Sequence, residues 1–64
     1  SAVYSFHISS RFGDARAYIH QNGIVLHTYF NEDGLESLTA RLSDDNYQRF
    51  TNRLQDYAIH EKRT

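Results

Sequence analysis

The sequence contains no cysteine, proline, methionine or tryptophan in its 64 residues. Without cysteine the chain can form no disulfide, and it offers no thiolate as a nucleophile or metal ligand. No hydrophobic run approaches the roughly 18 residues that a bilayer-spanning helix needs, so we expect no membrane association. These absences favour a cytoplasmic protein. Its stability must come from hydrophobic packing within the chain and from the surface that a second subunit would bury.

The chain also has too few residues for a large active site. A domain of 64 residues removes only about 60% of its unfolded surface from water, which leaves no material for a wide catalytic cleft or a second domain. Seven Lys and Arg against eight Asp and Glu give a formal charge of -1, so the net charge does not identify a partner. We therefore expect one domain over residues 1–64.

The three glycines, at positions 13, 23 and 34, are spaced by ten and eleven residues. This spacing, with alternating apolar and polar residues between the glycines, predicts strands joined by tight turns. Gly13-Asp14 fits a two-residue turn, Asn22-Gly23 is the strongest short hairpin signal, and Glu32-Asp33-Gly34 fits a three-residue loop. The predicted strands cover residues 2–12, 15–21, 24–31 and 35–42.

The last third of the chain predicts a helix over residues 44–60. Ser43 is a good N-cap, and the two following aspartates place negative charge in the first turn. Leucines at helical spacing also allow a short helix over 35–42 as an alternative to the fourth strand. The residues from His60 to Thr64 are expected to fray. The apolar stripe of the helix comprises Tyr47, Phe50, Leu54, Tyr57 and Ala58.

The expected fold class is α+β, a four-stranded antiparallel β-meander with one C-terminal α-helix packed on one face, in the order ββββα. Two layers of this kind leave the other face of the sheet uncovered. The plan is similar to that of PUR-type single-strand-binding repeats, a resemblance of topology that assigns no residue. The open sheet edges and the small size favour a homodimer.

In this register the uncovered face gathers basic and aromatic residues and no acidic ones. Arg11 lies opposite Arg16, and paired guanidinium groups suit a phosphate, although long arginine side chains can also splay into water. Exposed tyrosines can stack on bases, but tyrosine is also a common strand residue. The candidate binding residues are Arg11, Arg16, Arg41, Tyr18, Tyr29, His7, His20 and His27.

We therefore expect a small non-enzymatic protein that binds single-stranded nucleic acid on this face. The alternative is a protein-binding inhibitor or adaptor module that docks the same face on a larger protein. We expect no catalytic residue, metal, cofactor or small-molecule substrate, because no acid accompanies the serines and histidines and no glycine-rich phosphate loop occurs. A ribonuclease that uses two imidazoles is the least implausible enzyme.

Overall fold

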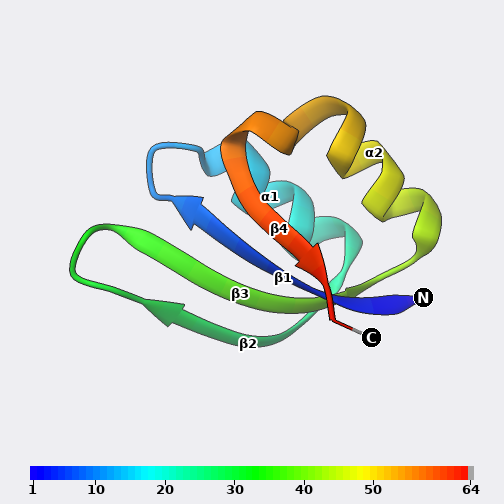
Figure 1. Cartoon of the computed structure of the whole chain (residues 1–64), viewed down its shortest axis with the longest axis horizontal. Coiled ribbons are helices and arrows are strands. Elements are labelled where there is room, and N and C mark those ends of the chain that lie inside the picture. The colour runs from blue at the N-terminus through cyan, green and yellow to red at the C-terminus, as the bar shows by residue number, and fades with distance from the viewer. Residues whose placement is uncertain (64) are drawn as a thin grey trace.

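The computed structural model describes residues 1–63, which form a four-stranded antiparallel sheet with two helices on one face (Figure 1). The strands lie side by side in the order β2-β3-β1-β4. This order in a βαββαβ chain is the split βαβ, or ferredoxin-like, arrangement. The elements are β1 (Ala2–Ser9), α1 (Gly13–Asn22), β2 (Ile24–Phe30), β3 (Leu35–Leu42), α2 (Asp44–Leu54), a 3₁₀ turn (Gln55–Tyr57) and β4 (Ala58–Lys62).

The α+β class and the antiparallel sheet are confirmed, but the predicted ββββα meander with a single helix is wrong. Residues 13–22 form α1 where a strand over 15–21 was expected. The helix predicted over 44–60 ends at Leu54, and the chain returns as β4, so the residues from His60 to Lys62 are paired rather than frayed. Thr64 lies outside the described residues. The topological likeness to PUR-type repeats therefore does not hold.

The segment 15–21, predicted as a strand, is a helix. Its apolar residues fit the two-residue period of a strand and the 3.6-residue period of a helix equally well. Ala15 and Ile19 are spaced by four, which places them on one face of a strand and equally on one face of a helix. Both are fully buried on the face of α1 that packs on the sheet. Asp14 contributes negative charge in the first helical turn. Local pattern alone does not separate these two conformations, and packing against the sheet selects the helix.

Gly23 marks a close approach of two strands rather than a hairpin turn. Its backbone is extended, and its N–H donates to the carbonyl of Ile19 at 2.9 Å, which closes the end of α1. A Cβ at this position would lie 2.9 Å from the carbonyl oxygen of Arg41 and 3.0 Å from the side chain of Leu42. Glycine is therefore needed here so that the start of β2 can lie against the end of β3.

The turn between β2 and β3 has the predicted geometry. Gly34 has a φ of 79°, the left-handed conformation that glycine adopts without strain. The N–H of Asn31 donates to the carbonyl of Leu35 at 2.9 Å, which closes a loop of three residues. β3 coincides with the strand predicted over 35–42, so the alternative short helix does not form there. Further along β2, a bulge at Leu26 shifts the expected pairing by one residue.

The core lies between the helices and the inner face of the sheet. Even-numbered residues of β1 and β3 point into it, as alternation predicts. The Ser43 side chain caps α2 by accepting from the N–H of Asn46 at 3.1 Å. The rings of Phe6 and Phe50 meet edge to face, with centroids 5.0 Å apart, and so join β1 to α2. No helix within residues 1–63 is long and apolar enough to cross a membrane.

Candidate binding surface

The face of the sheet turned away from both helices is called the open face. Residues paired across adjacent strands share a face, and the buried even-numbered side chains of β1 and β3 identify the inner one. The register then assigns the open face strand by strand. It consists of Ile24, His27 and Tyr29 on β2, Leu35, Ser37, Thr39 and Arg41 on β3, Val3, Ser5, His7 and Ser9 on β1, and Ile59 and Glu61 on β4.

Half of the residues that the sequence suggested for binding lie on this face. They are His7, His27, Tyr29 and Arg41, and all four are exposed. Tyr29 pairs with Ser37, and Ser37 pairs with His7, so these three residues form one row across the strands. The Ser37 hydroxyl and His7 Nδ1 are hydrogen-bonded at 2.9 Å, which fixes the orientation of that imidazole.

The other four suggested residues lie elsewhere. Arg11 lies in the loop after β1, and Arg16, Tyr18 and His20 belong to α1. The expected pairing of Arg11 with Arg16 across two strands is therefore wrong. The expected register treated α1 as a strand, and it extended the first strand to residue 12, whereas β1 ends at Ser9.

Arg16 makes an ion pair within the molecule. Its Nε donates to Oε1 of Glu36 at 2.8 Å, and the Thr28 hydroxyl donates to Oε2 at 2.7 Å. Glu36 is only 1% exposed, so both of its carboxylate oxygens are satisfied in a buried position. This network ties α1 to β2 and β3. In the described part of the chain it is the one ion pair that forms.

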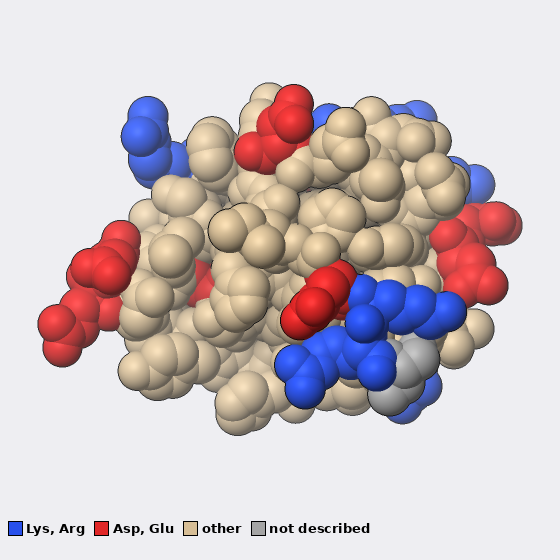
Figure 2. Space-filling model, in the orientation of Figure 1, with Lys and Arg blue, Asp and Glu red and all other residues tan. Residues whose placement is uncertain are grey.

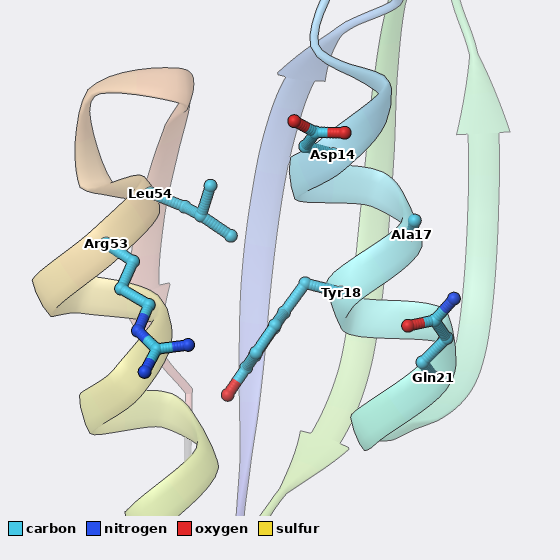
Figure 3. Close-up of a pocket in the computed structure, with 6 residues that line it drawn as sticks. All are labelled: Asp14, Ala17, Tyr18, Gln21, Arg53 and Leu54. Atoms are coloured by element: carbon cyan, nitrogen blue, oxygen red, sulfur yellow. The ribbon is translucent and has the colours of Figure 1, made fainter.

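Tyr18 holds the two helices together. Its hydroxyl donates to the carbonyl of Asn46 at 2.9 Å, and its ring lies 6.0 Å from that of Phe50. It also lines a hollow of about 380 Å³ between α1 and α2, where Tyr18 and Arg53 project from facing helices (Figure 3). This hollow lies on the helical side of the molecule, away from the open face.

The sequence analysis missed Arg63 and Glu61 because it treated the end of the chain as frayed. The Arg63 N–H donates to the carbonyl of Val3 at 2.7 Å, which continues the pairing of β4 with β1. Since Arg41 pairs with Val3 from the other side, two arginines flank Val3 at one end of the sheet. Figure 2 shows basic side chains gathered near the end of β4. Glu61 lies on the open face beside them, so the expectation of a face without acids is wrong.

Apolar side chains are exposed around the margin of the open face. Ile59 on β4 is 76% exposed and Ile24 on β2 is 64% exposed. The centre of the face, in contrast, carries small hydroxyl side chains such as those of Ser37 and Thr39. The four large side chains at the margin are Ile24, Tyr29, Leu35 and Ile59.

Two aromatic residues on the inner side of the sheet have shifted pKa values. Burial lowers the pKa of His60 below 6.5, and its Nδ1 lies 2.6 Å from the hydroxyl of Tyr47. Burial, followed by the charge of Asp44, raises the pKa of Tyr4 above 10.0. Both shifts favour the neutral form of the side chain. These residues belong to the core and not to the open face.

The polar side chains that bond to each other on the open face are those of His7 and Ser37. Within residues 1–63 no carboxylate is bonded to His7 to orient it as a base. No three His, Asp or Glu side chains of the described residues come together to hold a metal ion. No protein-family model, curated protein or solved structure significantly matches the chain, so its function must be argued from these residues alone.

Proposed function

We propose that the chain is a non-enzymatic binding module that docks a larger protein on its open face. The observation that carries this proposal is the exposure of four large apolar or aromatic side chains around the margin of that face. Isoleucine and tyrosine side chains held in water on one surface favour a partner that can bury them. Tyrosine and arginine are also enriched among the residues that dominate protein interfaces.

The partner surface should combine apolar and acidic residues. Ile59 and Ile24 would be buried against apolar side chains, because removing their exposed area from water is favourable. Arg41 and Arg63 would face carboxylates, which guanidinium groups bind through two parallel hydrogen bonds. Because these charges are exposed, the association rate should fall as salt is added.

Single-stranded nucleic acid is the second candidate ligand, and the two flanking arginines favour it. The face offers few aromatic rings on which bases could stack. Its central strands carry Ser37, Thr39 and Ser5 at the positions where such rings would contact the bases. Among residues 1–63, the one exposed tyrosine or phenylalanine ring of the open face is that of Tyr29, which lies on an edge strand. The distribution of side chains therefore supports a protein partner better than a nucleic acid.

The test compares two variants that alter opposite edges of the sheet. Ile59→Glu places a charge on the open face, and Phe30→Lys alters the inner side of β2, outside that face. The immobilised chain is offered a nuclease-treated lysate, and any captured protein is purified and its affinity measured by calorimetry. We expect wild type and Phe30→Lys to bind it equally, and Ile59→Glu to bind at least about tenfold more weakly, a loss of about 1.4 kcal/mol.

Fluorescence polarisation with labelled single-stranded oligonucleotides tests the second candidate. Two phosphate contacts, at Arg41 and Arg63, predict a slope of about -1.4 when log affinity is plotted against log salt. If this slope is observed and is lost in Arg41→Ala, the ligand of the open face is single-stranded nucleic acid and not a protein. Equal binding of a purified protein partner by wild type and Ile59→Glu would reject the open face as the docking surface.

A further inference from the structure

β2 is an unusually exposed apolar edge strand. Its seven residues include no Asp, Glu, Lys or Arg, and side chains on both of its faces are accessible to water. On the inner side, Phe30 is 57% exposed, because β2 extends beyond the helical layer (Figure 1). Leu26, at the bulge, is also exposed. Natural edge strands commonly carry a charge or a proline that discourages pairing, and β2 carries neither.

The backbone of β2 also presents unused pairing groups at its outer edge. The hydrogen bond from Asn31 to Leu35 makes these two residues a bonded pair. Bonded and non-bonded pairs alternate along an antiparallel ladder, so Phe30 and Thr28 direct their N–H and C=O groups away from β3. Another strand could therefore pair with β2 without breaking any bond within the sheet.

We propose that β2 pairs antiparallel with β2 of a second copy of the chain, so that two sheets become one. This inference goes beyond the proposed function, because it concerns the edge of the sheet and not the open face. The self-paired interface is isologous, with the same strand on both sides, and it closes at two copies. The Phe30 ring would then be covered by the inner side of the partner strand.

The charges at the ends of β2 identify a second copy as the occupant. The turn after β2 carries Glu32 and Asp33, and acidic side chains lie at that tip in Figure 2. At the other end, Ile24 pairs with Arg41 of β3, whose side chain is exposed. Antiparallel self-pairing brings the acidic tip of each copy toward Arg41 of the other. The edge is thus self-complementary in charge as well as in hydrogen bonding.

The opposite edge is less suited to this role. β4 has five residues, and Glu61 and Lys62 make up part of it. Charged side chains on a short edge strand oppose pairing with another chain. Ile59→Glu is therefore a matched control for Phe30→Lys, since each introduces a charge in place of an exposed apolar residue on an edge strand.

Sedimentation equilibrium of the wild type and these two variants tests the proposal, with circular dichroism to confirm folding. We expect a wild-type dimer, a dissociation constant raised at least about tenfold in Phe30→Lys, and no change in Ile59→Glu. A wild-type chain that stays monomeric up to about 1 mM would overturn the proposal. So would a dimer that Ile59→Glu weakens and Phe30→Lys leaves intact, because that result would place the interface at β4 or the open face.

A charge exchange gives a second test that does not alter β2. Glu32→Arg and Arg41→Glu should each weaken the dimer, because like charges then face each other across the two-fold axis. The double variant should recover most of the wild-type affinity, with the difference between single and double variants shrinking as salt is added. Failure of the double variant to recover, with both chains folded, would reject the antiparallel β2 pairing.

Discussion

The two edge strands of this sheet are held to the molecule in different ways. On β4, His60 packs among aromatic rings of the core, with its ring centroid 5.5 Å from that of Phe50 and 5.4 Å from that of Tyr47. On β2, the inner side is anchored mainly by the bond from Thr28 to Glu36 and by half-buried Val25. The core thus secures one edge, while the other remains available for association.

This difference shows how a small domain can divide stability and interaction between its edges. Elements with few buried apolar contacts open most readily, while those packed in the core open only on global unfolding. β2 has mostly exposed side chains and should open first, and β4 should be protected by the aromatic cluster around His60. The predictions below test this assignment, beginning with the largest expected effect.

The core against which β4 packs and the exposed edge strand β2 should respond very differently to loss of a phenylalanine. Phe50→Ala removes a fully buried ring that contacts Phe6 and His60, and should cost about 3–5 kcal/mol of unfolding free energy. Phe30→Ala, on exposed β2, should cost less than about 1 kcal/mol. Urea denaturation measures both values. Similar losses in the two variants would mean that β2 is packed as firmly as the aromatic core around Phe50.

The hydrogen bonds of Glu36, which hold β2 to the rest of the molecule, should contribute less to the free energy of unfolding than the aromatic ring of Phe50. Glu36→Ala removes both oxygens that accept from Arg16 and Thr28, and should cost about 2 kcal/mol. Amide hydrogen exchange should show faster opening of β2 than of β4 in this variant. The control is Thr39→Val on the open face of the same region, which should change stability by less than about 0.5 kcal/mol. Equal acceleration at both edges would contradict a local role for Glu36.

The weakest predicted effect is a dependence of stability on pH that originates at β4. Because burial lowers the pKa of His60 in the folded chain, the unfolded chain binds the proton more readily below pH 6.5. The stabilising contribution is therefore complete above about pH 6.5 and is lost as pH falls toward the lowered folded value. Thermal melting should shift downward between pH 7.5 and pH 5. His60→Gln should reduce that shift, whereas His27→Gln on β2 should leave it nearly intact.

The sequence predicted the β2–β3 hairpin better than residues 13–22 and 55–62. Apart from the bulge at Leu26, local signals from Ile24 to Leu42 agreed with the structure, since alternation and a left-handed Gly34 both describe a hairpin. Between Gly13 and Gly23, the alternation of small and apolar residues was equally compatible with strand and helix. The choice there depends on contacts with β3 and α2 that are distant in the chain, such as the bonds from Arg16 to Glu36 and from Tyr18 to Asn46.

Prediction of the binding surface failed wherever it depended on register. Tyr29, His27, His7 and Arg41 lie on the open face because alternation within their own strands assigns them to it. Arg16, Tyr18 and His20 are absent from the face because they belong to α1, and Arg11 is absent because β1 ends at Ser9. Arg63 and Glu61 joined it because β4 returned to pair with β1, and no local pattern distinguished that return from the continuation of α2.

The sequence by itself determined the inner and outer faces of β1 and β3, the turn at Gly34 and the start of α2 at Ser43. These features depend on side-chain alternation, on glycine's access to positive φ, and on a hydroxyl that caps the helix. Only the tertiary structure decided that residues 13–22 are helical and that residues 58–62 complete the sheet. The physical reason is that burial of Ile19 and pairing of β4 are long-range interactions, and their free energy outweighs the small conformational preferences of short segments.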